Sequence, residues 1–179
     1  GSTIDISIGT SELDSIKVQA NFAKSLATTY IAITSATVKD IVGNAVVAIG
    51  AASAKAAAAY TADNTVPTLV SFSLSMNASP TLKLTFSESV DSTTIKFDYF
   101  TLQKGSSDTS AALQLSANTV LVGFSVSSTV LEARLTLADA NEVKRLETLA
   151  VSRATTYLSV QQGAVKDWAS KDLAAITNT

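Results

Sequence analysis

Residues 27–43 read ATTYIAITSATVKDIVG, and residues 154–170 read ATTYLSVQQGAVKDWAS. The second stretch begins 127 residues after the first, and the match extends without gaps from residues 3–49 to residues 130–176. Apolar character is kept where identity is lost, as at Ile31 and Leu158. A match of this length predicts a structural repeat, with a first copy that holds only the later part of the pattern.

The complete copy is expected to fold as a series of short strands. LKLTF (82–86) alternates apolar and polar residues, which is typical of a strand with one buried face. The turn signal at residues 77–80 separates it from the strand before it. Further strands are expected at 69–74, 99–102, 112–115, 120–126, 130–137, 156–160 and 164–166. Short strands divided by turns predict a mainly β fold, an antiparallel β-sandwich.

One short helix is expected in each copy. In residues 139–151 an apolar stripe is formed by Val143, Leu146 and Ala150. The first copy has a similar stripe in residues 11–23, preceded by a capping box at Ser11-x-x-Asp14. Each helix is expected to cross over at one edge or end of its sandwich.

These patterns predict three parts of the chain. Residues 1–50 are the C-terminal half of a repeat, 51–66 are a linker, and 67–179 are a complete repeat. The linker begins with alanines of high helix propensity and ends in an extended joint before Pro67. Because the half repeat has no opening strands, either the chain is a piece of a longer one or another copy supplies them by strand complementation.

The composition excludes several classes of function. Apolar residues make up 46% of the chain and charged residues 16%, which is enough for a packed core, with a net charge of −2. The 13 basic residues are scattered, so no nucleic-acid partner is expected. No apolar run reaches the ~20 residues that span a bilayer. Histidine and cysteine are both absent, which excludes Ser-His-Asp and Cys-His catalysis and the usual zinc sites.

Three stretches resemble the Ig-like tandem-repeat domains of bacterial S-layer and adhesin-type surface proteins: 63–75 (DNTVPTLVSFSLS), 81–95 (TLKLTFSESVDSTTI) and 154–176 (ATTYLSVQQGAVKDWASKDLAAI). Ser89 stands where that pattern has proline. The closing turn is VKDIVGN (38–44) in the first copy, and VKDWASK (165–171) lacks its Gly-Asn. The resemblance implies tandem Ig-like domains in an extracellular or cell-surface protein.

Two sets of oxygen ligands are candidate sites. Asp40, Asn44, Asp63 and Asn64 could bind calcium and stiffen a joint between domains. Alternatively, Asp40 and Asp167 only form Asx-turns, and Asp63-Asn64 is a solvated linker. The carboxylates near residue 90 (Glu88, Asp91, Asp98) have the residue type used by glycosidases, but capping of a strand end is the better interpretation. No catalytic residue is predicted, and calcium is the one candidate cofactor.

The function expected is therefore non-enzymatic. The chain would be a structural subunit or spacer of an extracellular filament, S-layer or adhesin stalk. Its partners would be copies of itself or neighbouring repeats of the same chain. The alternative is an adhesin domain that binds a surface glycan or a protein through loops such as 104–110 or 116–119.

Overall fold

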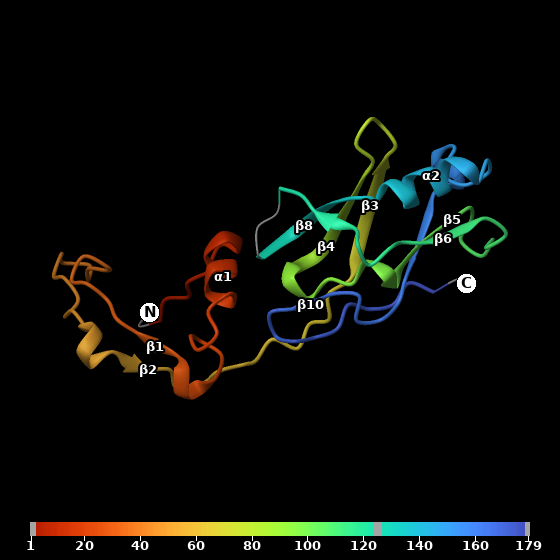
Figure 1. Cartoon of the computed structure of the whole chain (residues 1–179). Coiled ribbons are helices and arrows are strands. Elements are labelled where there is room, and N and C mark those ends of the chain that lie inside the picture. The colour runs from red at the N-terminus through yellow and green to blue at the C-terminus, as the bar shows by residue number, and fades with distance from the viewer. Residues whose placement is uncertain (1–2, 124–126, 178–179) are drawn as a thin grey trace. The chain divides into compact units, whose positions relative to one another are not determined.

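The computed structural model of the chain describes residues 3–123 and 127–177, and it divides into two compact units, Gly1–Asp63 and Asn64–Thr179 (Figure 1). The described residues are mostly β structure in antiparallel sheets, with two α-helices. The expected mainly β class is thereby confirmed. The expected 51–66 linker is split by the boundary, and its first part belongs to the first unit.

The larger sheet of the second unit is organised around β4 (Thr81–Asp91). β3 pairs antiparallel with the first half of β4, and β8 pairs along the opposite edge. Where β3 has ended, β10 pairs with Val90 and Asp91 on the edge that β3 leaves. The strands joined to β4 are β3 (Leu69–Ser75), β8 (Ser127–Arg134) and β10 (Lys166–Asp167), and β7 (Val120–Leu121) lies beyond β8.

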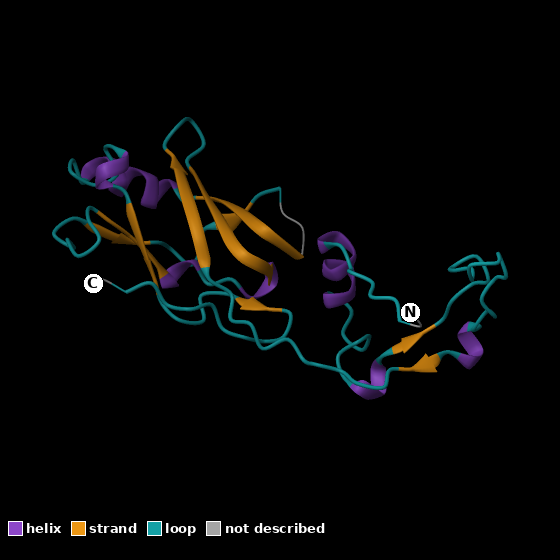
Figure 2. Ribbon diagram, turned by 180° about the vertical axis from the view of Figure 1, so that it is seen from behind, coloured by secondary structure: helices purple, strands orange, loops and turns teal. Residues whose placement is uncertain are grey.

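A second, three-stranded sheet has the order β6-β5-β9. Its strands are β6 (Ala112–Gln114), β5 (Phe100–Gln103) and β9 (Tyr157–Val160). Side chains from both sheets form one core, in which Leu84 of β4, Leu131 of β8, Phe100 of β5 and Val160 of β9 are all buried. This sharing of a core makes the unit sandwich-like, as the strands in Figure 2 show.

The alternation in β4 explains its position at the centre of the sheet. Leu82, Leu84 and Phe86 are buried, whereas Lys83 between them is exposed. The register then shifts between Thr85 and Val90, as at a β-bulge. The strand therefore runs beyond the expected 82–86, because β8 and β10 both pair with its last two residues.

Helix α2 (Leu137–Arg145) is shorter than expected and lies at one end of the second unit (Figure 1). It begins after Thr136, whose hydroxyl accepts a hydrogen bond of 3.0 Å from the backbone N–H of Asp139. Val143 is buried as the stripe predicted. The helix does not reach residue 151, because the backbone leaves the helical region at Leu146, which has a ψ of 79°.

The first unit contains α1 (Thr10–Lys17), β1 (Tyr30–Ile31) and β2 (Lys55–Ala56). The expected capping box at Ser11 is wrong: the N-cap is Gly9, and no side chain caps the helix. The alanine-rich segment forms only a 3-10 turn at Ala51–Ser53 before β2. So short a segment is below the length at which an isolated helix is stable, and β1 offers it backbone partners instead.

The first and last segments of the second unit are tied together, because the N–H of Ala174 donates a 3.0 Å hydrogen bond to the carbonyl of Pro67. Of the strand expected at 120–126, β7 covers two residues, and 124–126 lie outside the described residues. No helix in the described ranges combines the length and apolar character that crossing a membrane requires.

Candidate assembly interface

A tight turn before β1 recurs before β9. The N–H of Ala23 donates to the carbonyl of Thr28 at 2.9 Å, and the N–H of Ala150 donates to the carbonyl of Thr155 at 2.8 Å. Both alanines have a positive φ, 51° and 54°. Each turn also carries a capping box, at Ser25-x-x-Thr28 and Ser152-x-x-Thr155. These boxes were not predicted, although the Ser-x-x-Thr spacing in both copies was a signal for them.

The aspartate turns recur in the same way. Asp40 Oδ1 accepts hydrogen bonds from the N–H groups of Val42 (3.0 Å) and Asn44 (2.7 Å). At the equivalent place, Asp167 Oδ1 accepts hydrogen bonds from the N–H groups of Ala169 (2.9 Å) and Lys171 (2.6 Å). Both aspartates therefore form Asx-turns. The bridges that flank these turns also match: Ile33 with Ile49, and Val160 with Ile176.

The two units share these turns but differ in how deeply equivalent apolar side chains are buried. Leu131, Ala133 and Leu135 are 1%, 0% and 5% exposed in the second unit, whereas their counterparts Ile4, Ile6 and Ile8 are 65%, 73% and 56% exposed. Every buried residue of the described chain lies in the second unit. Apolar residues of the first unit that are exposed while their counterparts are buried are called here the exposed apolar set. Its members are Ile4, Ile6, Ile8, Leu13, Phe22, Ile31 and Val38.

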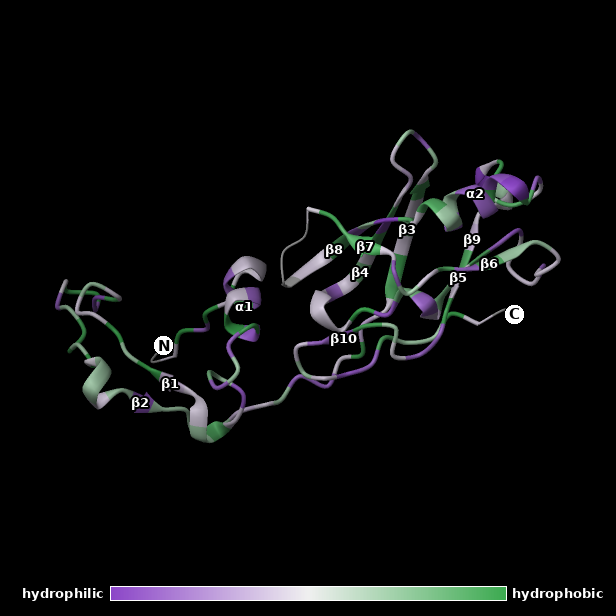
Figure 3. Ribbon diagram, in the orientation of Figure 1, coloured by the Kyte–Doolittle hydropathy of each residue, from purple (hydrophilic) through white to green (hydrophobic). Residues whose placement is uncertain are grey.

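Residues 3–9 differ most clearly from their counterpart in the second unit. Their counterpart in the second unit is the later part of β8, which pairs with β4. In the first unit this segment forms no strand, although its apolar residues alternate with polar ones. Figure 3 shows hydrophobic colouring in the stretch between the N-terminus and α1. A β-patterned segment that belongs to no sheet and has exposed isoleucines is typical of a site for strand addition.

β1 has a second open edge. Ile33 exchanges both backbone hydrogen bonds with Ile49, so the odd-numbered residues of this strand face β2 and the bridge beyond it. Even-numbered residues then face the opposite edge. In β9 that edge pairs with β5, and the N–H of Gln161 donates to the carbonyl of Tyr99 at 2.9 Å. In the described residues of the first unit, β1 belongs to a sheet of two strands only.

The first two residues of the expected calcium set lie together, and the third has a different neighbour. The Nδ2 group of Asn44 donates a 2.8 Å hydrogen bond to Asp40 Oδ2. This bond, with the backbone N–H groups of the turn, lowers the pKa of Asp40. Asp63 is the last residue of the first unit, and its carboxylate forms a 2.9 Å ion pair with Lys17. Asn64 begins the second unit. Calcium at these four residues stays a prediction.

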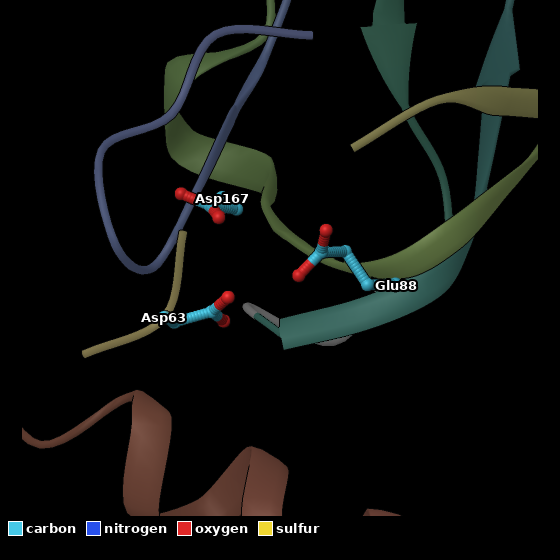
Figure 4. A group of neighbouring side chains, drawn as sticks. All are labelled: Asp63, Glu88 and Asp167. Atoms are coloured by element: carbon cyan, nitrogen blue, oxygen red, sulfur yellow. The ribbon is translucent and has the colours of Figure 1, made fainter. Parts of the chain in front are cut away.

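An acidic pair in the second unit was not anticipated. Carboxylate oxygens of Glu88 in β4 and Asp167 in β10 lie within 4.8 Å of each other. Figure 4 draws both carboxyl groups, together with Asp63 of the first unit. Asp167 is 3% exposed, and its Oδ2 atom has no hydrogen-bond partner among the described residues. The two residues are brought together by the pairing of β10 with the end of β4, and local sequence patterns do not reveal this pairing.

The other carboxylates near residue 90 have structural partners. Asp91 Oδ1 accepts hydrogen bonds from the N–H and the hydroxyl of Thr93, at 3.0 and 2.6 Å, and so caps the 3-10 turn Ser92–Thr94. The expected cap at this strand end is confirmed. The backbone carbonyl of Asp98 accepts a hydrogen bond from the side chain of Gln114.

The two loops considered as ligand-binding loops are held by hydrogen bonds, within loop 104–110 and from loop 116–119 to α2. In loop 104–110, Asp108 Oδ1 accepts a hydrogen bond from Ser110 N–H at 2.9 Å, and Lys104 lies 3.5 Å from the same carboxylate. The hydrogen bonds from Ser110, more than Lys104, lower the pKa of Asp108. In loop 116–119, Ser116 N–H donates to the buried carboxylate of Asp139 at 3.1 Å.

Compared with protein-family models, with curated proteins and with solved structures, the chain matches none. The likeness to Ig-like surface domains therefore rests on the quoted stretches alone.

Proposed function

We propose that this protein is a structural element of an extracellular surface assembly, a filament, S-layer or adhesin stalk, built from tandem Ig-like sandwiches. The observation that carries the proposal is the recurrence, 127 residues apart, of the same turns, caps and bridges. Such recurrence is typical of arrays in which one structural unit is repeated along a chain.

The second unit supports this role by its construction. Its core draws on both sheets and is contained within Asn64–Thr179. A domain with its own core can be strung with others through short connections, which gives a rod of repeated spacing. The hydrogen bonds within loop 104–110, and from loop 116–119 to Asp139 of α2, fit a spacer whose loops are held in place by the domain itself. The serine- and threonine-rich, weakly charged composition suits an extracellular location.

Electron microscopy of the purified protein, beside its mass in solution, tests the proposal. Ordered filaments or sheets are the expected result, because a structural subunit built from repeats assembles with copies of itself. Monodisperse particles that bind a glycan array would contradict it and favour the adhesin. In that case, removing the Lys104 and Asp108 side chains should abolish glycan binding, while Lys171→Ala, a change distant in sequence, should preserve it.

A further inference from the structure

We infer that the first unit is completed by an additional segment with the strand pattern of residues 64–127. Residues 64–127 themselves already complete the second unit, so this segment is a further one of the same kind. The inference rests on the proposed function, and it names the partner of the exposed apolar set. The front half is defined as residues 64–127, and the two back halves are defined as residues 1–49 and 128–176.

The second unit is the template for this completion. There, Leu84 of the front half lies opposite Leu131 of the back half, and Leu82 lies opposite Ala133. The positions equivalent to Leu131 and Ala133 are Ile4 and Ile6, which are exposed. A strand of the β4 type added antiparallel to residues 3–9 would therefore bury the isoleucines as β4 buries the core side of β8.

A second strand of the same front half fits the other open edge. In the second unit, β5 pairs with β9 through Thr101 opposite Ser159 and Gln103 opposite Tyr157. The equivalents of Ser159 and Tyr157 are Ala32, just after β1, and Tyr30 in β1, at the even-numbered positions that face away from β2 and from the bridge to Ile49. Because β4 and β5 both belong to the front half, one segment satisfies both open edges.

The charges that would face each other between the added strand and residues 3–9 agree with this register. Lys83 of β4 lies opposite Glu132 of β8. The residue equivalent to Glu132 is Asp5, so an incoming strand of the β4 type would again place a lysine opposite a carboxylate. Opposite charges facing each other across a strand pair stabilise it.

The front half within residues 64–127 of a second copy cannot complete the open back halves. These 179 residues contain two back halves and one front half, and that front half already pairs with residues 128–176. Any exchange of front halves between copies leaves as many back halves open as there are chains. The additional front half must therefore come from another segment with the same pattern.

The test joins an extra copy of residues 64–127 directly before residue 1 of the full chain. Residue 128 is the counterpart of residue 1, so the join reproduces the native spacing. Hydrogen exchange is then measured on peptides that cover residues 3–9 and 29–34, with residues 130–135 as the internal standard for a folded β8. We expect exchange in both test peptides to slow by at least roughly tenfold relative to the 179-residue chain.

The matched control carries Leu82→Asp and Leu84→Asp in the added copy only, and it should leave both test peptides fast. Unchanged fast exchange in the unmodified extended chain, with the standard still slow, would overturn the inference. So would protection of residues 3–9 in the 179-residue chain on self-association alone, because no added front half is then needed.

Reversing the charges of a facing pair tests the register between the added strand and residues 3–9. This comparison remains informative even if the extended chain is only partly folded. Asp5→Lys in the extended chain should speed exchange of residues 3–9 by a few-fold, roughly two to five, and Lys83→Asp in the added copy should restore it. Absence of rescue would overturn the assigned register. If all these results are negative while ordered filaments form, the proposed function stands and the front half is wrong as the completing partner.

Discussion

Ser170 adopts the left-handed backbone conformation, with a φ of 65°, at the place in its turn where Gly43 adopts a φ of 95°. Around both residues the turn is the same: Gly43 N–H donates to Asp40 O, and Ser170 N–H donates to Asp167 O, each at 3.1 Å. Glycine has no Cβ to strain in this region, whereas a serine is strained there. The second unit thus keeps the turn without the residue best suited to it.

Replacing Ser170 with glycine should therefore stabilise the second unit. Relief of left-handed strain is worth roughly 1–2 kcal/mol, and the greater freedom of glycine in the unfolded chain costs about 0.5–1 kcal/mol. We expect a net gain of about 0.5–1 kcal/mol in the free energy of unfolding, measured by urea denaturation. Ala169→Gly in the same turn is the control, and because Ala169 has no positive φ it should destabilise. Equal effects of the two changes would contradict this account.

Equivalent positions in the two units should respond differently to truncation. Leu131→Ala removes a fully buried side chain and should lower the free energy of unfolding of the second unit by about 2–5 kcal/mol. Ile4→Ala removes one that is 65% exposed and should change it by less than about 0.5 kcal/mol. The single tryptophan, Trp168, lies in the second unit and reports its unfolding by fluorescence. A large effect of Ile4→Ala on that transition would show that residue 4 is already packed.

The capping turn before β9 should contribute measurably to stability. Thr155 Oγ1 accepts hydrogen bonds from the N–H groups of Val151 (3.1 Å) and Ser152 (3.0 Å). Thr155→Val keeps the shape and removes the acceptor, so we expect a loss of about 1 kcal/mol. The control is Thr28→Val, the same change in the first unit, and it should leave the Trp168 transition where it was. Loss of stability from both variants would argue against separate folding of the units.

The pKa of Asp40 should reflect the hydrogen bonds of its turn. The hydrogen bond from the Asn44 side chain, followed by the backbone N–H of Asn44, lowers the pKa of Asp40 in the folded turn. The folded state then binds this proton less readily than the unfolded state. The turn is accordingly stabilised above about pH 4, and this stabilisation is lost as pH falls through the lowered pKa.

Carbon-detected NMR of the Asp40 carboxyl group measures this pKa directly. Asn44→Ala should raise it toward the ordinary value, because the strongest hydrogen bond to the carboxylate is removed. Asn21→Ala is the control and should leave the pKa of Asp40 unchanged. A titration curve that is identical in wild type and Asn44→Ala would refute the role of Asn44.

Local patterns predicted the elements whose side chains alternate or cap nearby. LKLTF predicted the position of β4, and the carboxylates near residue 90 predicted a cap at its end, which Asp91 provides. The same patterns did not predict that β4 continues to Asp91, because this depends on β8 and β10, which are distant in sequence. The acidic pair of Glu88 and Asp167 was not predicted for the same reason. The end of α2 was misjudged because the apolar stripe continues to Ala150, whereas the backbone already leaves the helical region at Leu146.

The hydrogen bond between Ala174 and Pro67 has a mechanical consequence. It joins the segment by which the chain enters the second unit to the segment by which it leaves. If the ends of this unit were pulled apart, the load would reach two rim contacts before β4: the pair of hydrogen bonds between Val160 and Ile176, and the bond between Ala174 and Pro67. Resistance of the unit to stretching would therefore depend first on a few backbone hydrogen bonds that hold its last segment to Pro67 and to β9.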